Sequence, residues 1–350
     1  MTALNFTMGK KIDVKTDIHL DGVSGELSEI LYYASLAPNS HNTQMWKVSL
    51  NPDKQKITIC LDEKRVLDQV DTGNREAYIS MGAYVQNLLS AFEAYGYSTG
   101  LEIKDPGSEE LVQVTFEKIA NESMRDTMIE KMTARHSDKR PFSQEEIDEA
   151  HVNALLNSTS GLYYFGRKSE SFAYLKEAAM AAYEVQSSHQ NARDELAKWL
   201  RFSDEEALQK KDGLPAEQLG FSGIKKVFYY LFVNRKSARE DGFAKQGNET
   251  AGKQLEHCAG FFVLTGLNSR KDLIETGMEL EKFWLNAVPY NIEVHPVSQA
   301  LEEEPYKHEI QKKLGVDKPV QMVLRVGYVK NYGQNAQIRR DLNQYITVER

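Results

Sequence analysis

Two long helical segments, 75–96 and 271–291, constrain the fold of this chain more than any other feature of its sequence. Both carry apolar residues at the spacing of an amphipathic helix, and they superpose at a constant offset of 195 residues. The superposition pairs similar residues: Gly82 with Gly277, Gln86 with Glu281, Tyr95 with Tyr290, and Gly96 with Asn291. Ordinary helix patterning is the alternative explanation for so few matches. If the repeat is real, it predicts two related α+β units that pack as the subunits of a homodimer would.

Short apolar runs before and after these helices have the length of strands. They cover 46–50, 56–61 and 111–116 in the first unit, and 161–166, 258–267 and 320–329 in the second. Further helices are predicted at 25–37, at 121–134, from a capping-box pair at Ser143 and Glu146 onward, and over most of 169–201. The fold class that follows is α+β, with mainly antiparallel sheets flanked by helices.

The composition argues against several classes of protein. A formal net charge of -8 on 350 residues opposes binding to nucleic acid or to an anionic membrane surface. The two cysteines, Cys60 and Cys258, lie far apart in apolar runs, which excludes a disulfide framework and predicts a reducing, cytoplasmic location. No CxxC, HExxH or other clustered Cys/His spacing supports a metal site. No apolar run reaches the ~20 residues that span a bilayer.

A loop between the first helix and the first strand carries six consecutive side chains that form hydrogen bonds: Asn39, Ser40, His41, Asn42, Thr43 and Gln44. A solvated polar loop is the ordinary explanation of such a run. The flanking Ala37 and Trp46 favour a different one, in which the loop grips a flat heterocycle with a polar rim.

A second segment, 134–142, has the composition of an anion-binding strand. Alternate residues of an extended chain point the same way, so Arg135, Ser137 and Lys139 converge on one side. Two cations and a hydroxyl on one face suit a phosphate monoester. The alternative is a solvated basic loop, and surface charge is likewise the ordinary explanation of the pair Arg339 and Arg340.

These segments together resemble the nitroreductase family of FMN-dependent oxidoreductases. The run PNSHNTQMW (38–46) is similar to the family's Pro-Ser-x-x-Asn-x-Gln-Pro-Trp loop, with Met45 in place of the second proline. The run RHSDK (135–139) is similar to the family's Arg-x-Ser-x-Arg/Lys phosphate segment. The helix GAYVQNLLSAFEAYG and the final LRVGYV followed by RR also look like family elements. The resemblance covers most of 26–342, except an insertion at 203–250.

The order of the two motifs differs from that of the ordinary family, in which the phosphate segment precedes the Asn-Gln loop and two subunits form two flavin sites. Here the loop lies in the first half and the phosphate segment opens the second. The chain therefore resembles a fused, pseudo-dimeric member similar to the Acg-type subgroup. The resemblance implies one nitroreductase-like half at 1–125, a second at 126–350, and one FMN between them, in a monomer or a homodimer of such chains.

The resemblance also implies which residues contact FMN. They are Arg135, Ser137 and Lys139 for the phosphate and ribityl chain; Asn39, Ser40, His41, Asn42 and Gln44 for the ring; Pro296, Ser298 and Gln299 for flavin N5 and O4; and Arg339 or Arg340 for the phosphate. Lys139 is the candidate for stabilising negative charge at flavin N1 and O2. No catalytic side-chain acid or base is implied.

The implied activity is hydride transfer from NAD(P)H to flavin N5 and then to a nitroaromatic, quinone or similar small acceptor. Neither nucleic acid nor membrane is expected as a partner. The insertion, with the apolar run 228–232, is predicted to cover the open face of the flavin as a lid, and a core helix is the alternative. Two rival functions stay open: a protein that holds FMN in a lidded site without nicotinamide-dependent turnover, and a ligand-binding or interaction protein without flavin.

Overall fold

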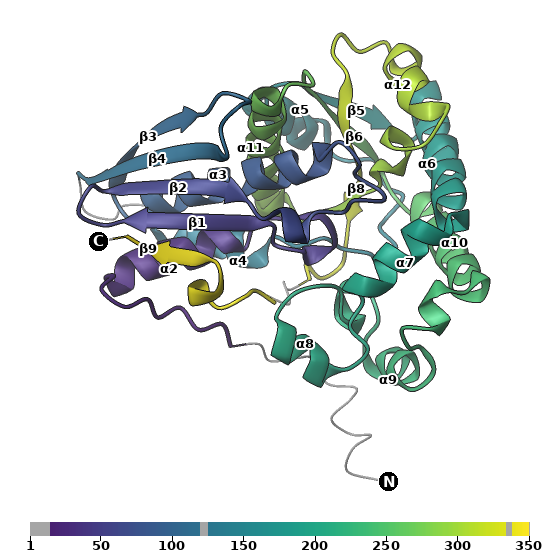
Figure 1. Cartoon of the computed structure of the whole chain (residues 1–350). Helices are drawn as coiled ribbons and strands as arrows, with labels where there is room; N and C mark the ends of the chain where they lie inside the picture. The colour runs from purple at the N-terminus through teal and green to yellow at the C-terminus, as the bar shows by residue number, and fades with distance from the viewer. Residues whose placement is uncertain (1–14, 120–124, 334–337, 350) are drawn as a thin grey trace.

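A computed structural model describes residues 15–119, 125–333 and 338–349. It shows a mixed α+β fold with two sheets, in which antiparallel pairing predominates (Figure 1). The strands are β1 (Trp46–Asn51), β2 (Lys56–Leu61), β3 (Tyr97–Ile103), β4 (Glu110–Lys118), β5 (Leu162–Gly166), β6 (Gly260–Thr265), β7 (Ile292–Pro296), β8 (Val320–Tyr328) and β9 (Ile346–Val348). The α-helices are α2 (Gly25–Ser35), α3 (Arg75–Ala94), α4 (Arg125–Ala134), α5 (Glu149–Ser158), α6 (Glu170–Ser188), α7 (Gln190–Trp199), α8 (Asp204–Lys210), α9 (Gly223–Phe232), α10 (Asp241–Glu256), α11 (Arg270–Ala287) and α12 (Tyr306–Leu314).

The first sheet has the strand order β3-β4-β2-β1-β9. Strands β1 and β2 form the predicted hairpin, in register from Trp46 opposite Leu61 onward. Strand β9 pairs with β1 in the parallel direction, so the end of the chain returns to the sheet of the first half. Strand β3 was not predicted: it is an edge strand whose residues are largely exposed, so it lacks the apolar alternation that marks a buried strand.

The second sheet has the order β5-β6-β8-β7 and is antiparallel throughout. All residues of β6 are buried, as are all but the last of β8, so both faces of these central strands are covered. An isolated bridge between Ser137 and Val294 places the predicted phosphate segment beside β7.

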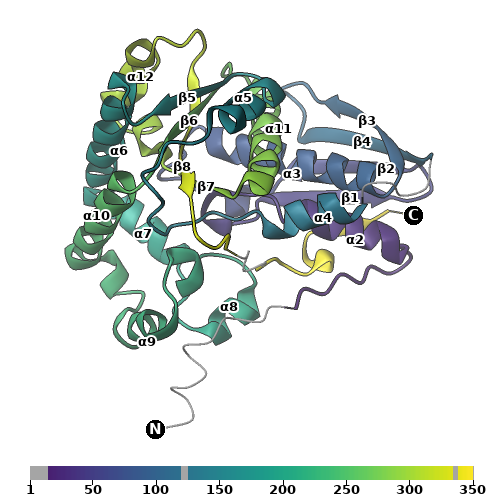
Figure 2. The ribbon, with the colours of Figure 1, turned by 180° about the vertical axis from the view of Figure 1, so that it is seen from behind.

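Helices α3 and α11 pack against each other between the two sheets, as Figure 2 also shows. At their contact a Cβ on Gly82 would lie 1.9 Å from the carbonyl oxygen of Ile274, and a Cβ on Gly277 would lie 1.9 Å from that of Ile79. Only glycine permits this approach. The reciprocal contact has the form of an isologous interface. It joins two residues that the 195-residue offset aligns, while the fused pseudo-dimer and its boundary near residue 125 stay predictions.

One helix start was predicted wrongly. The Ser143–Glu146 pair begins no helix: the Ser143 N–H donates to the Tyr328 carbonyl oxygen at 2.9 Å, and α5 begins later, with Asp148 as its N-cap. Residues 121–124 of the helix predicted at 121–134 lie outside the described residues, and the remainder is α4. In the described ranges, no helix combines the length and the apolar character that crossing a membrane requires.

Candidate functional site

A cavity of about 850 Å³ brings together the three predicted ligand-binding segments and the insertion. Its volume lies within the range of roughly 300–1,000 Å³ typical of small-molecule sites. The predicted residues that line it are Asn39, Ser40, His41, Asn42, Arg135, Ser137, Lys139, Pro296, Ser298, Gln299 and Arg339. The structure does not bring Gln44 or Arg340 to this lining.

The loop after α2 has an unusual backbone. His41, Asn42 and Gln44 have φ angles of 50°, 51° and 54°, in the left-handed region that costs a residue with a Cβ about 1–2 kcal/mol. The Asn39 side chain holds this conformation, because its Oδ1 accepts from the Gln44 N–H at 2.8 Å and its Nδ2 donates to the Ala37 carbonyl at 3.2 Å. Strain of this kind, fixed by surrounding bonds, is common where a loop borders a functional cavity.

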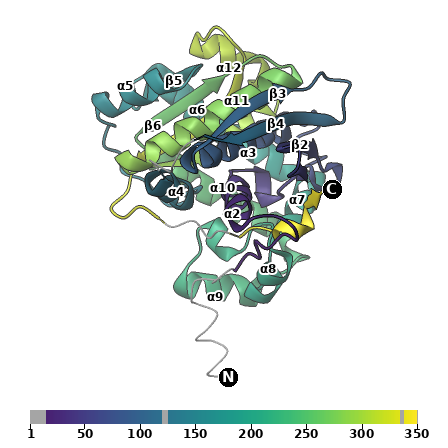
Figure 3. The same cartoon turned by 90° about the vertical axis from the view of Figure 1, so that its left-hand side faces the viewer.

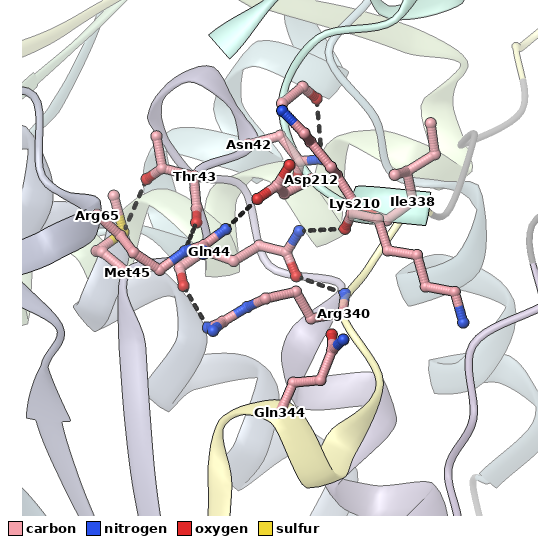
Figure 4. A network of polar contacts seen from close by, with 12 residues as sticks. Asn42, Thr43, Gln44, Met45, Arg65, Lys210, Asp212, Ile338, Arg340 and Gln344 are labelled. Carbon is pink, nitrogen blue, oxygen red and sulfur yellow. Dashed lines mark hydrogen bonds and ion pairs between the residues drawn. The ribbon is translucent and has the colours of Figure 1, made fainter. Parts of the chain in front are cut away.

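Asn42 and Gln44 join the loop to the insertion. The Asn42 Nδ2 donates to the Gly213 carbonyl at 3.1 Å, the Gly213 N–H donates back to the Asn42 carbonyl at 3.1 Å, and the Gln44 Nε2 donates to the Lys211 carbonyl at 2.8 Å. Arg340 completes the network in Figure 4, donating from its N–H to Gln44 Oε1 at 2.8 Å and from its guanidinium to the Gln44 carbonyl at 2.6 Å. These contacts occupy Gln44 and Arg340 in holding the loop, the insertion and the C-terminal segment together.

Two buried arginines meet the last carbonyl groups of α2. The Arg339 guanidinium donates to the carbonyls of Leu36 at 2.9 Å, Ala37 at 3.1 Å and Ser35, while Arg135 also donates to Leu36. Cations at a helix C-terminus are stabilised by the helix dipole and satisfy carbonyls that have no partner within the helix. Burial and the neighbouring charge of Arg135 lower the pKa of Arg339 to about 9. Arg339 is thus committed to the fold even though it borders the cavity.

Arg135 also has an acidic partner that the sequence did not predict. Its Nε lies 3.3 Å from Glu281 Oε1, both side chains are buried, and the Trp284 ring centroid lies 5.1 Å from the guanidinium carbon. Burial raises the pKa of Glu281 to about 7, and the charge of Arg135 opposes that rise. A phosphate at this point would share Arg135 with Glu281 and with α2.

Lys139 differs from the two arginines. Its side chain is half-buried in the cavity wall, and among residues 15–119, 125–333 and 338–349 its ammonium group has no hydrogen-bond or ion-pair partner. Loss of water and the nearby Arg325 charge lower the pKa of Lys139 to about 8, so the group is mostly protonated at pH 7. Ser137, two residues earlier, borders the same cavity, as the alternation predicts.

Two neutral histidines stand near this ammonium group. Burial, with the charge of Lys139 adding to it, lowers the pKa of His41 to about 4, and the described residues offer its buried Nδ1 no hydrogen-bond partner. Burial and the charges of Arg325 and Lys139 hold the pKa of His295 well below its usual range, and its Nδ1 accepts from Arg325 Nε at 3.1 Å. One cation and neutral ring nitrogens form a corner suited to an anionic group such as a phosphate.

The turn after β7 is fixed against β8. The Ser298 Oγ accepts from the Val323 N–H at 3.2 Å, and the Val297 N–H donates to the Val323 carbonyl at 2.8 Å. The Ser298 hydroxyl therefore holds the turn in place, while Pro296 and Gln299 border the cavity on either side of it.

Two acidic residues of the cavity wall were not predicted. Glu76 accepts from the Ser40 hydroxyl at 2.8 Å, and Glu302 accepts from Gln186 Nε2 at 2.6 Å. Burial, with the charge of Glu76, raises the pKa of Glu302 well above its usual range. Glu76 lies in the first turn of α3, where an acidic residue is an ordinary helix feature, so its type and position gave no sign of a site.

His136, Asp138 and Glu293 lie close enough together, within the described part of the chain, to suggest a metal site. Arg140 already neutralises them: its Nε is 2.8 Å from Asp138 Oδ2 and its guanidinium lies 3.6 Å from Glu293 Oε1. His136 Nε2 is 3.4 Å from the same Glu293 oxygen. We read this group as an ion-pair cluster.

The insertion forms one wall of the cavity through Leu214, Glu217, Phe221 and Phe243. Lys226, on the buried face of α9, lies 2.6 Å from Glu217 and 2.8 Å from Asp204. Other parts of the insertion thus border the cavity, but the apolar run 228–232 expected to cover the flavin does not: none of its residues lines the cavity, and Phe228, Leu231 and Phe232 are exposed on the surface.

The fold is α+β, and its cavity has the size of a small-molecule site. No family model matches the chain, but a curated relative does. The chain is 22% identical over 301 residues to a protein described as a probable NAD(P)H nitroreductase, PigM from Serratia sp., and the match covers 78% of this chain and 79% of that protein. This match confirms the resemblance to the nitroreductase family that the sequence motifs carry.

Two solved structures of FMN-dependent nitroreductases are also similar. NfnB from Mycobacterium smegmatis, in complex with NADPH, has a TM-score of 0.40 and 15% identity, covering 65% of this chain and 100% of that one. NfnB from Sphigopyxis sp. strain HMH has a TM-score of 0.40 and 14% identity, covering 64% and 99%.

Proposed function

We propose that the chain is an FMN-dependent NAD(P)H oxidoreductase of nitroreductase type that binds one FMN between two fused, pseudo-dimeric halves. One observation carries the proposal: the Lys139 ammonium, without a protein partner among the described residues, faces a cavity of about 850 Å³. The buried Nδ1 of His41, which no described residue pairs by a hydrogen bond, lies near it. This donor set fits the phosphate or the anionic ring edge of a flavin mononucleotide.

When bound, FMN supplies the N5 atom that takes up a hydride and passes it on. Lys139 and Ser137 hold the ligand from the segment beside β7, and Ser40 and His41 contact it from the loop of the first half. Because Lys139 sits where little water reaches it, its charge stabilises negative charge on a bound group more strongly than it would in bulk water. Gln44, Asn42 and Asn39 act indirectly, by keeping the strained loop in place.

NAD(P)H as the donor is supported by the name of the PigM relative, and small acceptors such as nitroaromatics or quinones fit the size of the cavity. The proposed setting is the cytoplasm. One observation favours a second function: residues of the insertion form part of the cavity wall. If that wall keeps nicotinamide out, the protein would hold FMN without nicotinamide-dependent turnover.

The visible absorption spectrum of the purified protein tests the proposal, with the released cofactor identified and counted. We expect one FMN per chain; a protein that neither carries nor takes up FMN would refute the flavin assignment. Anaerobic bleaching by NADH or NADPH then separates an oxidoreductase from an FMN holder. Lys139→Met should weaken FMN binding by roughly 10–100-fold, the worth of a charged hydrogen bond, whereas Lys245→Met, at an exposed lysine, should not.

A further inference from the structure

Helix α9 exposes a continuous apolar face. Ile224 is 73% exposed, Phe228 53%, Leu231 56% and Phe232 70%. Their spacing of four, seven and eight residues from Ile224 places them on one side of the helix. The rings of Phe228 and Phe232 stack with centroids 5.8 Å apart.

The opposite face of α9 fixes this orientation. Lys226 is buried and forms ion pairs with Asp204 and Glu217, and Tyr229 is 4% exposed. The apolar residues therefore cannot turn inward without breaking buried ion pairs. Figures 1, 2 and 3 all show α9 at the margin of the molecule beside α8, away from both sheets.

The segment that carries this face is basic along the sequence, unlike the chain as a whole. Residues 218–239 contain five Lys and Arg and no Asp or Glu, within a chain of net charge -8. Three of the five are paired internally: Lys226 with Glu217, Arg235 with Glu206 and Arg239 with Asp194. The other two are exposed: Lys225 in the first turn of α9, and Lys236 four residues after the helix ends.

We propose that α9 docks the protein on an anionic phospholipid surface, with its four apolar side chains at the acyl boundary and Lys225 and Lys236 among the phosphates. An amphipathic helix with lysines beside an apolar face has the chemistry for this position. A second copy of the chain fits the face less well, because a two-fold contact would bring like charges together. The proposal goes beyond the proposed function and does not depend on it.

This inference differs from the expectation of no membrane partner, which was drawn from the net charge of the whole chain. The field that matters at a surface is local, since charges more than about 10 Å away are screened at 0.1 M salt. Docking would also place the wall of the cavity, to which Glu217 and Phe221 belong, close to the lipid.

Vesicle flotation of the full chain tests the proposal, using phosphatidylcholine vesicles with and without phosphatidylserine. We expect salt-sensitive binding to the anionic vesicles only. The double variant Phe228→Ser/Phe232→Ser should weaken that binding more than roughly tenfold. Lys225→Gln and Lys236→Gln should each weaken it roughly fivefold. Leu267→Ser, at a residue 51% exposed outside the insertion, is the matched control and should bind like the wild type.

Absence of binding to anionic vesicles, equal binding to neutral vesicles, or binding that survives the double Phe variant would each overturn the proposal. Sedimentation velocity is measured in parallel. A dimer that Phe228→Ser/Phe232→Ser dissociates would assign the face to contact between copies and would also overturn the lipid assignment. Thermal unfolding of each variant confirms that the substitutions leave the fold intact, which the exposure of these residues predicts.

Discussion

The contact between Gly82 and Gly277 makes a sharp prediction about stability. In Gly82→Ala the new Cβ would lie 1.9 Å from the Ile274 carbonyl oxygen and 2.9 Å from the Gly277 Cα. Both of these atoms belong to the backbone of α11, so no side-chain rotation relieves the overlap. The two helices must move apart by about 1.5 Å to reach ordinary van der Waals contact.

The magnitude follows from two opposing effects. Overpacking a close contact costs about 1–3 kcal/mol, and the separation of the helices adds lost dispersion along their contact. Alanine recovers about 1 kcal/mol through its higher helix propensity. We expect Gly82→Ala to lower the free energy of unfolding by about 2–4 kcal/mol, at the upper end of single-residue effects.

Urea denaturation followed by circular dichroism measures this change, with Gly252→Ala as the control. Gly252 lies inside α10, where an added Cβ would meet its nearest atom at 3.7 Å, so alanine should stabilise the protein there. In a double-mutant cycle Gly277→Ala should cost less when Gly82→Ala is already present, because the helices have already separated. A Gly82→Ala protein as stable as Gly252→Ala would refute the close approach of α3 and α11.

Three further predictions concern the site. FMN affinity should fall as pH rises above about 8, because the apoprotein loses the Lys139 charge there; fluorescence titration measures this, and Lys139→Arg should shift the decline to higher pH. Gln44→Ala should lower the free energy of unfolding by about 2–4 kcal/mol, since it leaves buried partners on Arg340 and the insertion without hydrogen bonds; a loss below about 0.5 kcal/mol in urea would contradict the network. Burial raises the pKa of Glu281 from 4.5 to about 7 in the folded state, so the folded protein binds this proton more tightly than the unfolded chain does. The free energy of unfolding should therefore fall as the pH rises from about 4.5 to 7, and Glu281→Gln should reduce this slope in urea denaturation.

Helices α3 and α11 and the central strands of this fold were predictable because their signals are local, whereas α8, α10 and α12 were not predicted. The apolar spacing of α3 and α11 and the short apolar runs of β1, β2 and β8 follow directly from burial of one face or of both. Strands β3 and β9 were not predictable in this way. Strand β3 is an exposed edge, and β9 is three residues long and is a strand only because β1 lies beside it.

The segments that border the cavity were predictable, but the hydrogen-bond and ion-pair partners of each side chain were not. The composition of 135–139 and of 39–44 indicated an anion and a heterocycle, and the structure brings both segments to one cavity. The hydrogen bonds that occupy Asn42 and Gln44 depend on residues 211–213, about 170 positions away in the chain, and no local pattern encodes such a partner. The same holds for Glu281, whose contact with Arg135 arises only when α11 packs in place.

Whether a side chain already has partners within the protein decides whether a variant of it can identify a ligand contact. Arg339 satisfies the end of α2, and Arg135 is shared among α2 and Glu281, so loss of FMN from variants at either residue would follow from a disturbed loop as readily as from a lost contact. Lys139 differs, because the part of the protein that the structure describes gives its ammonium no partner to lose. Removing a half-buried charge with no partner leaves the stability of the apoprotein unchanged or raises it. Lys139 is therefore the position where the binding of the cofactor and the stability of the fold can be measured separately.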